Sequence, residues 1–212
     1  SLIKAGVLPR LNSDVSALYI DATAHDTEAR LLHLLRRKFK GLAPELDLAD
    51  ALRELRERTE LRSGHKILVV LDQFEQWLHQ WQSGADAELV RALRQCDGGN
   101  IQCVLMVRDD FWLPVSRFMR QMELGIVDGT NAMLVDSFDP DHAQRVLREL
   151  GIAYKRLPSN PAEQTAEQEA FISQATEDLA EDNRLYPVRL AVFVEMVKDR
   201  EWTPATLDEM GG

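Results

Sequence analysis

Two segments of the chain are apolar almost without interruption, and each runs directly into a charged residue. Residues 67–71 read ILVVL and lead into Asp72, and residues 101–107 read IQCVLMV and lead into Arg108. Continuous rather than alternating apolarity is typical of strands that are covered on both faces, as in the middle of a parallel sheet. Residues 17–22 and 131–135 are two shorter strand candidates.

Apolar residues recur at helical spacing between these strand candidates. They predict helices over residues 27–40 and 46–62 and two more over 85–95 and 111–122. Strands that alternate with helices of this length imply right-handed crossovers, and therefore an α/β fold with a parallel sheet. The opening residues, 1–11, are amphipathic and read as the body of a helix whose start has been cut away.

The pattern changes after Phe138, where no further strand is evident. Asp139 and Pro140 have the order of a helix N-cap and a first helical residue, and they open a predicted helix over 142–150 that Gly151 ends. A polar stretch over 156–168 then precedes predicted helices at 170–180 and 187–198. We therefore expect an α/β core over residues 1–137 and a small helical domain over residues 138–212.

Composition narrows the class of protein. The 212 residues carry a net charge of −10, which argues against a general nucleic-acid binder because such proteins need a basic face. No apolar run is long enough to cross a bilayer, and no signal peptide opens the sequence. Cys96 and Cys103 lack metal-like spacing and read as buried, reduced thiols of a cytoplasmic protein.

Asp72 is the first candidate for chemistry. Open α/β sheets bind ligands at the carboxyl ends of their strands, where Asp72 is expected to lie. A carboxylate beside a phosphate site can hold Mg²⁺ through its water shell, which is the role of a Walker-B aspartate. The alternative is a carboxylate that only caps a helix or loop. Glu75, three residues later, could polarise an attacking water, or it could be a solvated charge in the next helix.

Arg108 is the second candidate, because it follows the next predicted strand and should emerge at the same edge of the sheet as Asp72. An arginine there can hydrogen-bond a terminal phosphate and so report its presence. The alternative is an ion pair with Asp109 or Asp110. The five histidines form no zinc-binding pattern, and Pro187 is suited to the first position of a helix.

Taken together, several segments resemble the STAND class of P-loop NTPases, and specifically the bacterial group called novel STAND NTPase 1. They keep their order over nearly the whole chain and read SLIKAGVLPRL, LVVLDQFEQW, RQCDG, VLMVRDDFW, RFM, AYKRLP, PVRLAVFVEMVK and EWTP. The fold implied is a parallel-sheet, AAA+-like nucleotide-binding core followed by a helical lid. In that family a Gly-rich loop ending in Gly-Lys-Ser directly precedes the first of these segments.

The resemblance implies roles for five residues. Asp72 is the Walker-B metal carboxylate, Glu75 the secondary acidic group and Arg108 the sensor arginine at the γ-phosphate. Pro187 is the lid proline on the adenine side, and Arg189 is a phosphate contact from the lid. The implied ligands are ATP or ADP with Mg²⁺. Since the first strand and the phosphate loop precede Ser1 in the family, we expect the 212 residues alone not to bind ATP with useful affinity.

STAND proteins are generally signalling switches in which ATP and ADP favour different angles between core and lid. The resemblance therefore implies nucleotide-dependent homo-oligomerisation and fused partners: an effector domain (protein kinase, caspase-like or TIR) and WD40 or TPR repeats. Gln73 occupies the position at which many related ATPases carry a catalytic glutamate, and a glutamine cannot take a proton from water. A scaffold or oligomerisation module without hydrolysis is the main alternative. A DNA-handling motor is disfavoured by the acidic charge.

Overall fold

The computed structural model describes residues 3–58, 64–81 and 87–211. The chain divides into two compact units, Ser1–Met133 and Leu134–Gly212, each with its own hydrophobic core. Sequence analysis expects this division after residue 137.

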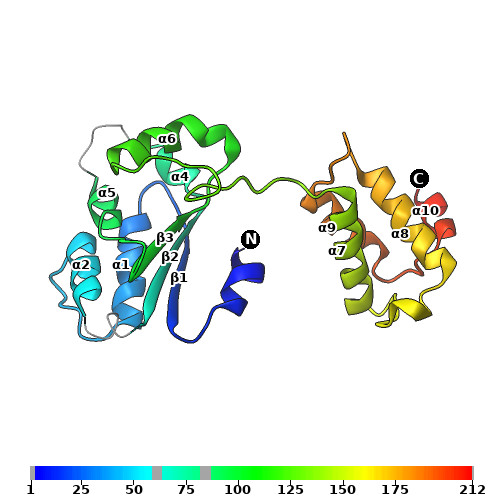
Figure 1. Cartoon of the computed structure of the whole chain (residues 1–212), viewed down its shortest axis with the longest axis horizontal. Helices are drawn as coiled ribbons and strands as arrows, with labels where there is room; N and C mark the ends of the chain where they lie inside the picture. The colour runs from blue at the N-terminus through cyan, green and yellow to red at the C-terminus, as the bar shows by residue number, and fades with distance from the viewer. Residues whose placement is uncertain (1–2, 59–63, 82–86, 212) are drawn as a thin grey trace. The chain divides into compact units, whose positions relative to one another are not determined.

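The first unit is built on a three-stranded parallel sheet (Figure 1), which confirms the predicted α/β fold. Its strands are β1 (Val15–Asp21), β2 (Lys66–Asp72) and β3 (Ile101–Leu105), in that spatial order. β2 is therefore the central strand. Its register with β1 pairs Asp21 with Asp72, so the two strands end together in a pair of acidic residues.

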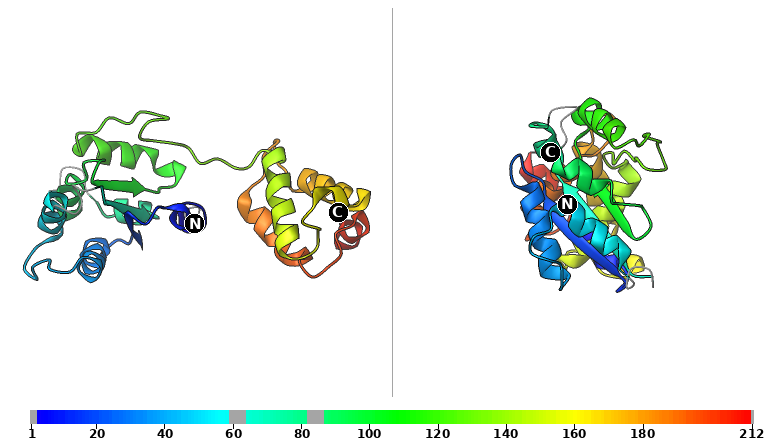
Figure 2. Two further views of the ribbon diagram at one scale, coloured as in Figure 1. Left: turned by 60° about the horizontal axis from the view of Figure 1, so that its bottom comes forward. Right: turned by 90° about the vertical axis from the view of Figure 1, so that its left-hand side faces the viewer.

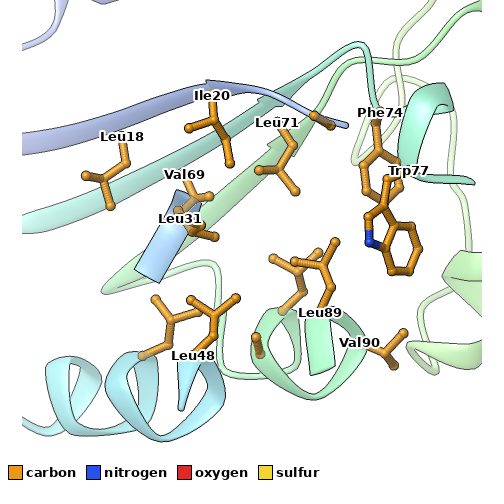
Figure 3. Close-up of a cluster of buried hydrophobic side chains, with 14 of the residues drawn as sticks. Leu18, Ile20, Leu31, Leu48, Val69, Leu71, Phe74, Trp77, Leu89 and Val90 are labelled. Atoms are coloured by element: carbon orange, nitrogen blue, oxygen red, sulfur yellow. The ribbon is translucent and has the colours of Figure 1, made fainter. Parts of the chain in front are cut away.

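The main core of the first unit lies on one face of this sheet, against α1 (Thr27–Lys38), α2 (Leu48–Glu57) and α5 (Glu88–Leu93). Leu18 and Ile20 of β1 and Val69 and Leu71 of β2 point to this side, toward leucines of the three helices (Figure 3). Because side chains alternate along a strand, Tyr19, Asp21, Val70 and Asp72 belong to the opposite face. Val70 is fully buried there, so the central strand is apolar on both faces, as predicted.

The carboxyl end of β2 leads into an aromatic cluster. The short helix α4 (Glu75–Leu78) follows the strand at once, and α6 (Trp112–Gln121) packs over it. Phe74 stacks on Trp77 with 5.4 Å between ring centroids, and Phe118 of α6 meets both rings edge-on. The cluster anchors the segment that carries Glu75.

The predicted helix over residues 1–11 is only partly present among the described residues, as a π-helical turn η1 (Ile3–Val7) and a 3₁₀ turn η2 (Leu8–Arg10). The helices predicted over 46–62 and 85–95 are present but shorter, as α2 (Leu48–Glu57) and α5 (Glu88–Leu93), and parts of both ranges lie outside the described residues.

The strand predicted over residues 131–135 is wrong. Asn131 instead closes a tight loop, in which its side-chain Oδ1 accepts from the Val127 N–H at 2.7 Å and its Nδ2 donates to the Gly125 carbonyl at 2.8 Å. Met133, Leu134 and Val135 are 78%, 71% and 64% exposed, and within the described ranges no strand pairs with them. Apolar residues of high strand propensity do not form a strand without a neighbour to complete the ladder.

The second unit is helical, and the left view in Figure 2 shows its helices gathered into one cluster. Its elements are α7 (Pro140–Ala153), the 3₁₀ turn η4 (Pro161–Glu163), α8 (Ala166–Leu179), α9 (Pro187–Val197) and α10 (Pro204–Met210). Asp139 caps α7 by accepting from the His142 N–H at 2.7 Å, as its pattern predicts.

Two boundaries in this unit differ from the prediction. Gly151 does not end α7, which continues to Ala153; this glycine instead packs closely against Leu157 and Trp202, which would have to shift to admit a Cβ atom. α8 begins inside the stretch predicted to be polar linker, where Thr165 and Gln168 form a capping box. In the part of the chain that the structure describes, no helix is both long and apolar enough to cross a membrane.

Candidate functional site

Asp72 lies at the carboxyl end of the central strand, half-buried, with both carboxylate oxygens hydrogen-bonded. Its Oδ1 accepts from the Gln73 backbone N–H at 2.9 Å, and its Oδ2 accepts from the Tyr19 hydroxyl. Gln73 has a φ of +53°, in the left-handed region that non-glycine residues seldom occupy. This conformation turns the chain out of β2 and directs its N–H at the preceding carboxylate.

Glu75 is buried, with 5% of its surface exposed, at the start of α4. Its Oε2 atom is buried without a hydrogen-bond partner among the described residues. Leaving a buried carboxylate oxygen unpaired is costly, so such atoms call for a ligand, water or ion. The alternative interpretation of Glu75 as a solvated charge is wrong.

Arg108 lies three residues beyond β3. The ladder between β2 and β3 continues past the strand, because the Met106 N–H donates to the Leu71 carbonyl at 2.9 Å and the Phe74 N–H donates to the Met106 carbonyl at 2.9 Å. Arg108 and Asp72 therefore emerge at the same edge of the sheet.

The Arg108 guanidinium is exposed and forms a two-pronged ion pair with Asp110. Its Nε and Nη2 atoms donate to the two carboxylate oxygens at 3.1 and 2.8 Å. This is one of the alternatives that the sequence left open for Arg108. An exposed pair of this kind contributes roughly 0–1 kcal/mol, so a stronger anion could replace Asp110 at little cost.

Pro187 and Arg189 belong to the second unit, at the start of α9. Pro187 is the first residue of that helix, as predicted. The Arg189 guanidinium donates to Glu181 Oε2 at 2.7 Å and lies over the Tyr186 ring, 5.4 Å from its centroid. The structure brings Asp72, Glu75 and Arg108 to one sheet edge of the first unit. Pro187 and Arg189 belong to the second unit, and their contacts are described only within that unit.

Sequence analysis missed three residues at this edge. The Tyr19 hydroxyl also lies 3.2 Å from Asp21 Oδ1, and Lys4 Nζ lies 3.5 Å from Asp21 Oδ2. The Lys4 ammonium sits over the Tyr19 ring, 4.2 Å from its centroid. The available signal was Asp21, near the end of the strand candidate over residues 17–22, which a parallel register places beside Asp72.

The family assignment rests on most of the chain. Residues 1–190 match the family model described as Novel STAND NTPase 1. The chain belongs to this family. A search of curated proteins found no match. Membership makes the chain a STAND-type NTPase module and agrees with the resemblance inferred from the sequence motifs.

One solved structure that this STAND module resembles is the Walker-type ATPase of Pyrococcus abyssi. The TM-score is 0.53 at 20% identity, over 87% of this chain and 55% of the archaeal chain. The likeness supports the α/β fold. The STAND module spans about half the length of that neighbour.

The residues at the sheet edge fit a hydrated cation better than a cage of protein ligands. Among the described residues, no group of three or more histidine, cysteine or acidic side chains is arranged to hold a metal. Mg²⁺ characteristically keeps several waters and takes one or two carboxylates together with phosphate oxygens. Asp72 and the unpaired Glu75 oxygen supply acceptors of that kind.

Proposed function

We propose that this STAND module, as part of a larger signalling protein, binds ATP with Mg²⁺ and acts as the nucleotide-dependent switch of that protein. The observation that carries the proposal is Asp72 at the carboxyl end of the central parallel strand, in a chain that belongs to an NTPase family. Ligands of open α/β sheets bind at this end.

Asp72 would hold Mg²⁺ through its water shell, and Glu75 would orient and polarise the water that attacks the γ-phosphate. Bound Mg²⁺ supplies neutralisation of the charge on the phosphate oxygens. The burial of Glu75 supports its role, because a carboxylate in a dry site interacts more strongly with a water than an exposed one does.

Arg108 is proposed as the group that detects the γ-phosphate. Its exposed guanidinium is held by Asp110 in a geometry that suits any planar or tetrahedral oxyanion. If the Arg108 guanidinium released Asp110 and bound the γ-phosphate instead, the segment after β3 would contact the nucleotide directly. Pro187 is proposed to pack on the adenine side, and Arg189 to exchange Glu181 for a phosphate.

ATP and ADP would then favour different arrangements of the core and the helical lid. This difference is proposed to control homo-oligomerisation and an effector, with WD40 or TPR repeats as fused partners in a cytoplasmic protein. A ligand shifts such an equilibrium only as far as its affinities for the two states differ, so ATP with Mg²⁺ and ADP must differ in their preference for the two arrangements.

Calorimetric titration of the full-length protein with MgATP tests the proposal. In the Asp72→Asn variant, the affinity for Mg²⁺ in the presence of ATP should fall roughly 10–100-fold, the range for loss of a residue that holds a metal through its outer shell. Asp128→Asn, on an exposed loop of the same unit, is the matched control and should leave binding unchanged. If Asp72→Asn altered neither binding nor turnover, the assignment of Asp72 would be wrong.

Gln73 favours a second candidate, a module that binds nucleotide but does not hydrolyse it. Gln73 is exposed immediately after Asp72, and its amide cannot accept a proton from water. Single-turnover measurement of ATP hydrolysis separates the two functions, since a pure scaffold gives only the background rate. Gln73→Glu should raise the rate if this position faces the attacking water, whereas no change would leave Glu75 as the candidate base.

A further inference from the structure

Tyr19 lies between two carboxylates at the edge of the sheet. Tyr19 is on β1, on the same face as Asp21 and Asp72, which are paired directly across the two strands. Its hydroxyl contacts Asp21 Oδ1 at 3.2 Å and makes a shorter contact with Asp72 Oδ2. The residue that contacts the proposed metal carboxylate thus comes from a different strand, 53 positions earlier in the chain.

A tyrosine hydroxyl has one proton and can donate it fully to one acceptor at a time. The two carboxylates therefore compete for the same proton. Lys4 biases this competition, because its ammonium lies 3.5 Å from Asp21 Oδ2 and partly neutralises that carboxylate. Asp72 accepts from the Tyr19 hydroxyl through Oδ2, and its other oxygen accepts from the Gln73 N–H.

We propose that Tyr19 is a positioning residue for Asp72, and that Lys4 favours this role by orienting the Tyr19 ring and by pairing with the competing carboxylate of Asp21. The inference rests on the proposed function of Asp72 as the Mg²⁺ carboxylate. Hydrogen bonds at both oxygens fix the rotation of the Asp72 carboxylate before any cation arrives, while the neutral phenol leaves its negative charge intact. A carboxylate oxygen has more than one acceptor site, so the same oxygens can also accept from a metal-bound water.

The position of the Lys4 ammonium over the Tyr19 ring supports this role. A cation 4.2 Å from the ring centroid is attracted to the face of the ring, and the same ammonium is paired with Asp21. Lys4 thereby orients the ring and supplies the charge that Asp21 needs. The segment of η1 is linked in this way to the ends of both strands.

The competing assignment is that Asp21 itself binds the cation as a second carboxylate. The two assignments predict opposite results for Asp21→Asn. If Asp21 only competes for the Tyr19 proton, its neutralisation leaves more of that proton for Asp72, and metal affinity stays the same or rises. If Asp21 is a ligand, its neutralisation lowers metal affinity as much as Asp72→Asn does.

The experiment uses the full-length protein with ADP and Mn²⁺ as the probe, and measures free Mn²⁺ by electron paramagnetic resonance. Tyr19→Phe removes only the hydroxyl and should weaken Mn²⁺ binding roughly 10-fold, within the range for loss of an outer-shell partner. The affinity for ADP without metal should stay within about twofold of the wild type, because the phosphate contacts are not changed. Tyr154→Phe, in the second unit, makes the same chemical change away from the site and should have no effect.

The outcomes separate this inference from the proposed function. If the wild-type protein binds no ADP, or binds it without any dependence on Mn²⁺, the proposed function fails. If the wild type shows that dependence and Tyr19→Phe retains it in full, the positioning role is overturned. A loss of Mn²⁺ affinity in Asp21→Asn would also overturn it.

Lys4→Met provides a second test that does not touch the hydroxyl. Without the ammonium, Asp21 competes more strongly for the Tyr19 proton, so Mn²⁺ affinity should fall by a smaller factor than in Tyr19→Phe. The double variant Lys4→Met with Asp21→Asn should recover the Mn²⁺ affinity, because the Asp21 negative charge that competes for the proton is removed together with the Lys4 ammonium. Failure of the second substitution to restore affinity would contradict the proposed sharing of the proton.

Discussion

At the scale of single residues, Cys103 shows how packing sets chemical reactivity. Its thiol packs against the core of the first unit, where a hydrogen bond with the Cys96 thiol, together with burial, raises its pKa well above the ordinary value. Both effects favour the protonated thiol over the thiolate. The thiolate is the reactive form, so Cys103 should be chemically quiet although part of its surface is exposed.

We expect iodoacetamide to label Cys103 at least about 10-fold more slowly than a free thiol at pH 8, because each pKa unit lowers the thiolate fraction about tenfold. Peptide mass spectrometry of the native chain measures the rate. The raised pKa also affects stability. Because the folded state prefers the neutral thiol, the contribution of Cys103 to the free energy of unfolding is complete below the ordinary pKa of about 9.0 and is lost as the pH rises toward the raised pKa. Cys103→Ala should remove this alkaline loss of stability, and rapid labelling of native Cys103 would contradict the expectation.

Asp97 is a second residue whose surroundings fix its charge. Its Oδ1 accepts backbone N–H groups from Gly99, Asn100 and Ile101 at 2.9, 2.8 and 3.0 Å, which closes the turn that leads into β3. Desolvation of the carboxylate opposes ionisation, but these three hydrogen bonds outweigh it and lower the pKa of Asp97. The turn therefore prefers the ionised side chain.

Asp97→Ala should destabilise the first unit by about 1 kcal/mol, the typical cost of removing such a cap. The contribution of the charge is present above the ordinary pKa of about 3.8 and is lost as the pH falls through the lower folded value. Asp97→Asn keeps an acceptor oxygen and should lose less stability at pH 7, with a smaller further loss in acid. Urea unfolding at pH 7 and pH 3 measures both variants, and equal acid sensitivity in Asp97→Asn and wild type would contradict the assignment.

At the scale of elements, the sequence predicts what local pattern determines and misses what depends on distant neighbours. The three strands of the sheet and the site edge follow from apolar runs and from the rule that parallel strands end together. Asn131 and the exposed residues after it form no strand, because pairing requires a partner that no local pattern reports. Tyr19 was missed for the same reason, since its contact with Asp72 exists only through the register of two strands.

Gly151 gives the clearest example of a local signal that tertiary packing overrides. A glycine late in a helix normally predicts the end of that helix, but α7 continues through it. A Cβ atom at this position would lie 2.6 Å from Leu157 Cδ1 and 2.6 Å from Trp202 Cζ3. The glycine is therefore required by the close approach of a loop and a buried tryptophan.

Gly151→Ala should destabilise the second unit by about 1–3 kcal/mol, the range for an extra methyl group in a packed core. Leu157 can shift, but Trp202 is 2% exposed and stacks on Phe171, so part of the strain remains. Gly125→Ala is the matched control, because a Cβ there meets nothing within 4 Å. Thermal unfolding followed by circular dichroism measures both, and a Gly151→Ala variant as stable as wild type would contradict the packing argument.

At the scale of the whole molecule, the second unit has the internal bonds of an independent domain. Its core combines Phe171, Leu190, Val194 and Trp202 with further apolar residues of the same unit. The Trp202 indole N–H donates to the Val197 carbonyl at 3.1 Å, so the largest side chain of the core is also satisfied in hydrogen bonding. The short hairpin at Asp182 and Asn183, both in the left-handed region, lies within the same unit.

We therefore expect residues 134–212, expressed alone, to be helical and to unfold cooperatively. Trp202 is the single tryptophan of this segment and is buried, so its fluorescence should shift to longer wavelength when the core opens. The same midpoint by fluorescence and by circular dichroism would mark a two-state domain. Gly151→Ala should lower that midpoint in the fragment, as we also expect for the full chain. A fragment with little helix, or one whose two probes give separate midpoints, would show that the second unit requires the first unit to fold. The proposed switch would then have to act by folding rather than by rotation of a preformed domain.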